Sequence, residues 1–210
     1  MLCPYLEKLN EMKIVLASGS PRRVDALKGL KLKFDVVPSH FAENLDKSTF
    51  KTCGDYTVEN AYQKAKEVWD RLSASPETAP DVVIGADTVV ILDEKIIEKP
   101  KDAEDAFNIL SSLSGRAHSV VTGLVLIWRR DGEVCFSKSI ETTDVHFSPL
   151  SPEVINSYIA TGSPFDKAGA YGIQDGVASS FVCGLSGCYF NVTGFPTNRF
   201  CRELIKALQL

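Results

Sequence analysis

The feature that most constrains the fold is one long apolar segment, DVVIGADTVVIL, which spans residues 81–92. Continuous aliphatic and β-branched residues over this length are typical of a buried strand. Only Gly85, Ala86, Asp87 and Thr88 interrupt the segment. It therefore predicts a buried strand that carries polar groups in its middle.

Hydrophobic periodicity elsewhere predicts a mixture of strands and helices. Residues 13–18 are predicted to form a buried strand, followed by a turn at Gly19, Ser20 and Pro21 and a short helix over residues 22–30. The other predicted elements are a strand at 34–38, helices at 58–72, 103–115, 151–162 and 198–208, and a hairpin of 120–129 with 134–147. This mixture favours an α/β fold with one extended sheet.

Composition excludes several classes of protein. The 210 residues, 44% of them hydrophobic, suffice for one globular domain or two tightly joined lobes. The net charge of −4 argues against a nucleic-acid partner. No apolar run approaches the roughly 18 residues of a membrane span, and the start resembles no signal peptide, so we expect a cytosolic protein without a membrane partner. Six cysteines without CxxC spacing predict free thiols.

The turn after the first strand is a candidate anion site. Ser18 to Arg23 stand where a strand leads into a helix N-terminus, which exposes backbone N–H groups. Arg22 and Arg23 add donors suited to phosphate oxygens, although neighbouring residues on a helix point about 100° apart. The alternative is that both arginines are solvated on the first helical turn.

Asp87 is the second candidate, because an unpaired charge in an apolar strand would cost several kcal/mol. A metal ion, a lysine or a positioned water would each serve as its partner, whereas the alternative is an aspartate that caps a neighbouring turn. Lys99 ends the next apolar piece, beside Glu98, and lysines in such places are ordinarily exposed.

Two glycine-containing segments, 166–174 and 191–196, either wrap a ligand or make tight turns. The three histidines, His40, His118 and His146, are isolated from any nucleophile pattern. We therefore predict structural or surface roles for them.

Six segments together resemble the Maf (septum-formation-associated) family of nucleotide pyrophosphatases. In chain order they are LASGSPRR, IGADTVV, EKP, LSGRAHSVVTG, DKAGAYGIQ and NVTGFP, within residues 13–208. The chain is similar as well to the Maf portion of eukaryotic proteins that join it to a methyltransferase-like domain. The resemblance implies a Maf-like domain over residues 13–210, preceded by an N-terminal extension, 1–12. It also implies an elongated mixed sheet with flanking helices and two lobes around a central substrate cleft.

The implied reaction is hydrolysis of a nucleoside triphosphate to the monophosphate and pyrophosphate, with a divalent cation, Mg²⁺ or Mn²⁺. Asp87 matches the family's proton acceptor, which activates the attacking water. Glu43 is the nearest match for a second carboxylate that holds the metal with Asp87. Lys64 and Lys99 match lysines that neutralise the triphosphate. The resemblance leaves a homodimer open.

The residues predicted to contact the substrate are Ser18, Arg22, Arg23, Thr88 and Gln174. Three of them, Arg22, Thr88 and Gln174, match the branch of the family that acts on dTTP and UTP, whereas the branch that acts on 7-methyl-GTP carries Trp, Gln and Glu. The planar amide of Gln174 offers both a donor and an acceptor to a pyrimidine edge.

Two other functions compete with this interpretation. The inosine triphosphate pyrophosphatases have a related architecture and reaction, but they would show a different N-terminal phosphate motif. A nucleotide-binding or regulatory protein in cell division, without turnover, would not need Asp87, Lys64 and Lys99 together.

Overall fold

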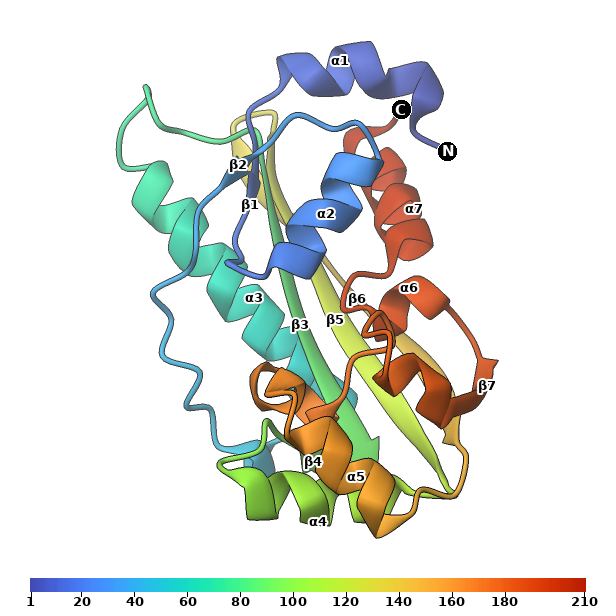
Figure 1. Cartoon of the computed structure of the whole chain (residues 1–210). Coiled ribbons are helices and arrows are strands. Elements are labelled where there is room, and N and C mark those ends of the chain that lie inside the picture. Colours follow the sequence, from blue (N-terminus) through green and yellow to red (C-terminus); the bar gives the residue numbers. More distant parts are fainter. The chain divides into compact units, whose positions relative to one another are not determined.

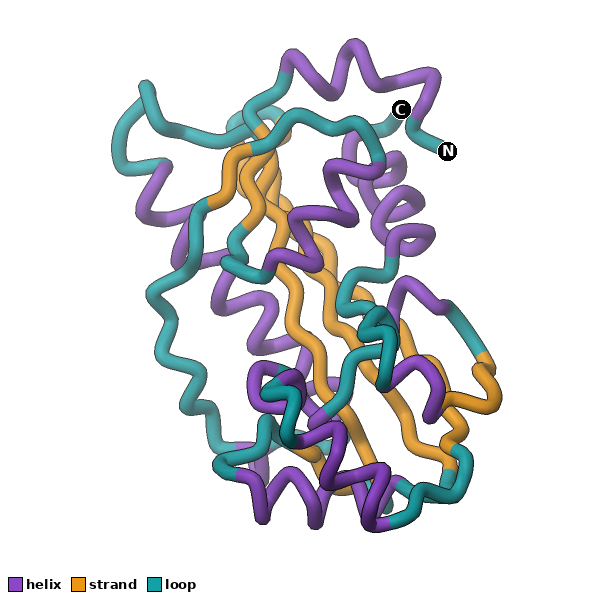
Figure 2. Tube along the Cα trace, in the orientation of Figure 1, coloured by secondary structure: helices purple, strands orange, loops and turns teal.

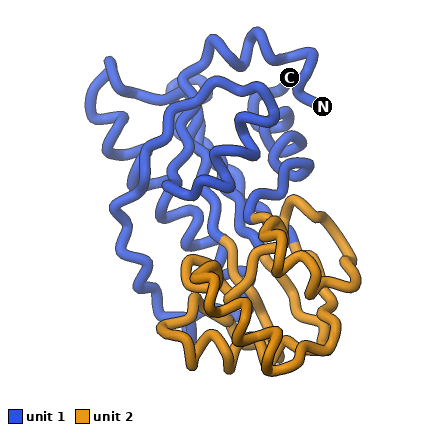
Figure 3. Tube along the Cα trace, in the orientation of Figure 1, with its two compact units in different colours: residues 1–87, 122–141, 194–210 blue, residues 88–121, 142–193 orange.

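The computed structural model describes all 210 residues, and the chain divides into two compact units (Figures 1 and 3). Unit 1 comprises residues 1–87, 122–141 and 194–210, and unit 2 comprises residues 88–121 and 142–193. Three of the four points at which the chain changes unit lie inside long strands. The predicted α/β class and the presence of two lobes are thus confirmed.

The strands form one mixed sheet in the order β2-β1-β3-β5-β6-β7, with β4 paired to β3. Their bounds are β1 Ile14–Leu16, β2 Asp35–Val36, β3 Val82–Leu92, β4 Lys95–Ile97, β5 Ala117–Arg130, β6 Glu133–Phe147 and β7 Val182–Ser186. β1 is parallel to both neighbours, with Val15 opposite Asp35 and Val83. β4 and β7 run antiparallel to β3 and β6.

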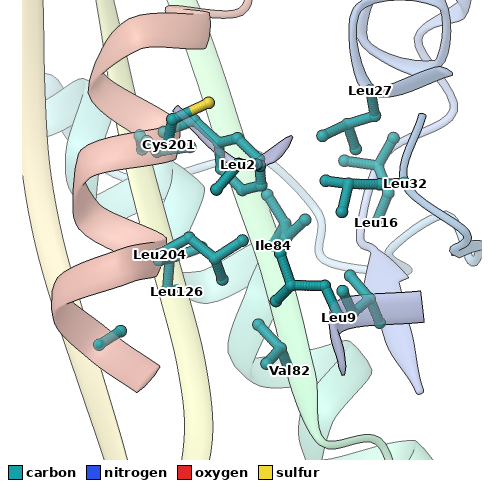
Figure 4. Packing of buried hydrophobic residues seen from close by; sticks show 14 of the residues in the cluster. Leu2, Leu9, Leu16, Leu27, Leu32, Val82, Ile84, Leu126, Cys201 and Leu204 are labelled. Carbon is teal, nitrogen blue, oxygen red and sulfur yellow. The ribbon is translucent and has the colours of Figure 1, made fainter. Parts of the chain in front are cut away.

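Helices cover both faces of the sheet in unit 1. The helices of the chain are α1 Leu6–Glu11, α2 Pro21–Gly29, α3 Cys53–Leu72, α4 Ala103–Leu113, α5 Pro152–Ile159, α6 Tyr189–Val192 and α7 Thr197–Leu208. On one face α1, α2 and α7 bury Leu9, Leu27 and Leu204 against Leu16 and Ile84 of the strands (Figure 4). The alternate strand residues form a second cluster with α3. Burial on both faces explains the continuous apolar run of β3.

The packing of α3 on the sheet depends on two glycines. A Cβ atom at Gly85 of β3 would lie 2.4 Å from the carbonyl oxygen of Ala61 and 2.7 Å from the Cβ of Ala65. At Gly123 of β5 it would lie 2.5 Å from the Cα of Val58. Real Cβ atoms do not approach so closely, so only glycine lets the helix backbone rest on these strands.

Unit 2 has its own apolar core, built from α4, α5, the far ends of the long strands and the turns of residues 163–181. Aromatic rings dominate it: Tyr158 packs edge-on against Phe181, and Phe147 against Tyr171. Ser151 caps α5 by accepting from the Val154 backbone N–H, as its position before Pro152 predicts.

Several elements differ from those predicted from the sequence. α1 lies in residues 1–12, for which no helix was predicted because many of these residues are polar, yet its Leu9 is fully buried. α3 begins five residues before the predicted start at Val58, where Thr52 and Asp55 form a reciprocal capping box. The short β4, β7 and α6 were not predicted, because a few residues carry no clear periodicity. No helix combines the length and hydropathy that crossing a membrane would require.

Replacing Gly85 with alanine should destabilise the fold by about 1–3 kcal/mol, because the added methyl group meets the α3 backbone. Gly29→Ala is the matched control, since nothing lies within 4 Å of a Cβ there and Gly29 ends α2. Urea unfolding measures both variants. Equal stability of Gly85→Ala and the unmodified protein would show that α3 can move away from the strand freely.

Candidate functional site

The turn between β1 and α2 holds one arginine in a fixed position. The Ser18 hydroxyl accepts hydrogen bonds from Arg23 Nη1 at 3.1 Å and from the Ser20 N–H at 3.2 Å. Arg23 Nε donates to the Gly194 carbonyl oxygen at 3.0 Å. Ser20 occupies the N-cap position before Pro21 without a side-chain cap. The alternative that both arginines are merely solvated therefore fails for Arg23.

The electrostatic environment of Arg23 links this turn to the carboxylates. Burial lowers the pKa of the Arg23 guanidinium from its usual value, and the nearby Asp87 carboxylate opposes that shift. Arg22 lowers the same pKa further, and Glu43 raises it. Arg22 itself is partly exposed on the first turn of α2.

Lys64 joins the two predicted carboxylates. Its Nζ lies 2.8 Å from Asp87 Oδ1 and 2.6 Å from Glu43 Oε2. The Lys64 and Asp87 side chains are only 12% and 13% exposed, whereas Glu43 is 55% exposed. A lysine is thus the partner that the buried charge of Asp87 requires. Asp87 does not act merely as a cap for a neighbouring turn.

Backbone geometry explains why these two side chains meet. Asp87 stands two residues after Gly85 in β3, so both face the side of the sheet that α3 covers. Lys64 lies on α3 between Ala61 and Ala65, the two residues that touch Gly85. The close approach at Gly85 therefore places Lys64 at the Asp87 carboxylate.

The cluster of Glu43, Asp87, Lys64 and Arg23 combines two carboxylates with two cations. No group of three or more His, Cys, Asp or Glu side chains is arranged to hold a metal alone. Mg²⁺ in nucleotide-binding sites commonly takes one or two protein carboxylates and completes its shell with phosphate oxygens and water. The carboxylates of Glu43 and Asp87 fit that requirement.

Three predicted site residues, Thr88, Lys99 and Gln174, belong to unit 2. Thr88 is partly buried in β3, directly after Asp87. Lys99 is exposed in the loop after β4, and Gln174 is exposed in a turn. Neither Lys99 nor Gln174 forms a hydrogen bond or ion pair within the chain. Their assignment to the site stays a prediction.

The segment 166–174 shows what its glycines do. Gly169 has φ +73° and packs against the Val90 side chain. Gly172 leaves room for the Lys167 side chain, whose Nζ donates to the Ser163 carbonyl at 2.6 Å. These glycines permit tight turns, which is the simpler of the two interpretations of the segment.

His118 has a structural role, as predicted. It is 4% exposed, its Nε2 lies 2.8 Å from the Tyr171 hydroxyl oxygen, and its ring packs edge-on against Phe147. Burial lowers the pKa of His118 to about 4, assisted by His146, while Asp144 opposes the shift. The imidazole is therefore neutral at neutral pH.

Comparison with known proteins identifies the family of the chain. Residues 13–207 match the family described as Maf-like protein. This chain belongs to the Maf-like family. The Maf-like chain is 47% identical over 196 residues to a dTTP/UTP pyrophosphatase of Clostridium perfringens, covering 92% of this chain and 96% of that one. It is 44% identical over 189 residues to a nucleoside triphosphate pyrophosphatase of Dictyostelium discoideum, covering 89% and 87%.

A human relative is longer than this Maf-like chain. It is a probable bifunctional dTTP/UTP pyrophosphatase/methyltransferase protein, 47% identical over 210 residues. The match covers 98% of this chain and 34% of the human protein, so the chain spans about a third of that relative's length.

The sequence alone did not indicate every group that builds the site. The Gly194 carbonyl, which accepts from Arg23, lies in the segment 191–196, for which the sequence left a ligand-binding loop and a tight turn open. A backbone carbonyl has no signature in the sequence, because every residue carries one.

His118 should make the stability of the Maf-like chain depend on acid pH. Its folded-state pKa of about 4 lies below the ordinary value of 6.5, so the unfolded chain binds more protons between these pH values. The contribution of His118 to the free energy of unfolding should therefore be complete above about pH 6.5. It should fall as the pH drops toward 4, by roughly 3 kcal/mol at most. Denaturant unfolding across pH 4–7 should show a shallower slope for His118→Phe; an unchanged slope would assign the effect to other groups.

Proposed function

We propose that this chain hydrolyses nucleoside triphosphates, preferentially dTTP and UTP, to the nucleoside monophosphate and pyrophosphate. The observation that carries the proposal is the bridge of Lys64 between Asp87 and Glu43, next to the Arg23 guanidinium. The cluster joins two cations, suited to phosphate oxygens, to two carboxylates, suited to accept a proton, and Lys64 and Asp87 are largely buried. The pyrophosphatases named among the relatives support the same reaction.

Asp87 is the proposed general base. A water molecule attacks the α-phosphorus, its oxygen forms a new bond there, and the bond from that phosphorus to the bridging oxygen breaks. An ionised carboxylate only accepts hydrogen bonds, so it orients the water and takes its proton. Pyrophosphate then leaves with the electron pair of the broken bond.

The cationic side chains stabilise the charge that develops on the leaving pyrophosphate. Lys64 is held by two carboxylates and Arg23 by Ser18 and the Gly194 carbonyl, so neither must reorganise when the charge appears. A divalent cation, Mg²⁺ or Mn²⁺, would be held by Glu43 and Asp87 and would neutralise phosphate oxygens. We assign Lys99 to the same charge-neutralising role by its match to the family motif.

The preference for pyrimidine substrates is assigned to Arg22, Thr88 and Gln174. The exposed amide of Gln174 has no partner within the chain, so both its donor and its acceptor are available to a base edge. We further expect a cytosolic enzyme that acts on free nucleotides without a nucleic-acid or membrane partner.

Replacing Asp87 with asparagine should lower kcat for dTTP by about 10²-fold or more, because an amide does not take a proton from water. Pyrophosphate release in the presence of Mg²⁺, with EDTA as a control, measures this. Asp93→Asn is the matched variant, since Asp93 pairs with Arg116 at an exposed position. Near-normal turnover by Asp87→Asn would remove Asp87 from the mechanism. A folded, unmodified protein that releases no pyrophosphate from any nucleotide would favour a binding role instead.

Exchanging Arg22→Trp, Thr88→Gln and Gln174→Glu together should shift the preference away from dTTP and UTP. Ratios of kcat/KM across a panel of canonical and methylated nucleotides measure the change. An unchanged profile would place specificity in other residues. The Arg22→Trp variant alone separates loss of a phosphate contact from a changed base preference, because only the former lowers kcat/KM for every nucleotide alike.

A further inference from the structure

The segment that carries Glu43, residues 37–46, contains no fully buried residue. Residues 37–46 follow β2 as a continuous loop without regular secondary structure (Figure 2). None of these ten residues is buried. Ordering the backbone costs about 1–2 kcal/mol per residue. Val37 packs against the apolar cluster beside α3 at the start of the segment, and polar contacts hold the residues that follow it.

The polar contacts converge on one carboxylate of α3. Glu67 Oε2 accepts hydrogen bonds from the Ser39 hydroxyl at 3.0 Å and from the His40 backbone N–H at 2.9 Å. The Ser39 hydroxyl oxygen in turn accepts from the Phe41 N–H at 3.0 Å. Three consecutive residues of the loop thus depend directly or indirectly on Glu67.

Arg71, one turn further along the helix, contacts the same loop. We call Glu67 and Arg71, with their hydrogen bonds to residues 38–41, the clamp. Arg71 Nε donates to Glu67 Oε1 at 2.7 Å, and its Nη2 donates to the Pro38 carbonyl oxygen at 3.0 Å. The Arg71 hydrogen bond, with those from His40 and Ser39, lowers the pKa of Glu67 to about 2. The carboxylate therefore stays ionised throughout the neutral range, where charged hydrogen bonds are strongest.

The clamp and the catalytic lysine share one face of α3. Glu67 follows Lys64 by three residues, so the two side chains are neighbours on the helix surface. Glu43 follows His40 by three residues, and its carboxylate reaches Lys64 at 2.6 Å. The loop runs beside α3 and is attached to it at two successive places (Figure 1).

The second attachment is a single ion pair between Lys64, 12% exposed, and Glu43, 55% exposed. Solvent at Glu43 weakens such a pair, and it fixes only one side chain of the loop. We propose that Glu67 is a positioning residue for Glu43. With Arg71 it fixes residues 38–41 on α3, and this holds the Glu43 carboxylate at Lys64, beside Asp87, where it can bind a divalent cation. The role of Glu43 toward the cation rests on the proposed function, whereas the fixing of the loop does not.

The first test is hydrogen exchange of the metal-free protein. In Glu67→Ala, protection of the His40 and Phe41 amides should fall by about tenfold or more, because Glu67 accepts from His40 and holds the Ser39 hydroxyl to which Phe41 donates. Asp70→Ala is the control: it removes the exposed ion pair of Asp70 with Lys66 on the same helix but touches no loop residue. Glu67→Gln keeps an acceptor for the His40 N–H and should lie between the two. Unchanged protection in Glu67→Ala would overturn the clamp.

The second test measures pyrophosphate release from dTTP as the Mg²⁺ concentration is varied. Glu67→Ala should raise the Mg²⁺ concentration for half-maximal rate by about 10-fold, as is usual when a group that orients a metal ligand is removed. Asp70→Ala should not. In a Glu43→Ala background the further change Glu67→Ala should have little effect, because the two residues act through one carboxylate.

The outcomes separate this inference from the proposed function. Additive effects of Glu67→Ala and Glu43→Ala would show that Glu67 acts elsewhere and would overturn the positioning role. If the unmodified protein hydrolyses no nucleotide, the proposed function fails. Hydrogen exchange of the unligated protein still tests the clamp: lost protection at His40 and Phe41 supports it, and retained protection overturns it.

Discussion

The close packing of α3 against the sheet is the contact on which unit 1 depends. At Gly85 the carbonyl of Ala61 and the methyl group of Ala65 occupy the space that any side chain would need. Gly123 serves the same purpose in the neighbouring strand. Because the helix rests directly on the strand backbones, a lysine one residue from Ala65 reaches a carboxylate two residues from Gly85.

The charge balance of the site follows from that packing. Asp87 lies in an apolar strand, where an isolated carboxylate would be costly, and Lys64 removes that cost. A second carboxylate, Glu43, and a second cation, Arg23, keep the cluster close to neutral. Under the proposed function, a nucleotide with a divalent cation would add charges of both signs to this site, and the protein groups would need little rearrangement to receive them.

Elements with long periodic patterns were predictable from the sequence, and short ones were not. The run of 81–92 became β3 with nearly the same bounds, and the hairpin of β5 and β6 was extended by only a few residues. α1 escaped prediction because its buried side, chiefly Leu9, is surrounded by charged residues. The anchoring of the loop by Glu67 also escaped, since a glutamate followed four residues later by an arginine is an ordinary surface pair on a helix.

The sequence by itself determined which chemical groups this protein carries and in which local structures they lie. The family and the reaction class follow without coordinates from three features: Asp87 in an apolar strand, two arginines at a helix N-terminus and a six-motif pattern. Only the tertiary structure decided that Lys64 is the partner of Asp87, that Glu43 shares it, and that Arg23 donates to Ser18. The reason is physical: periodicity reports the environment of one residue, whereas a contact between residues 23 positions apart depends on how closely a helix and a strand pack.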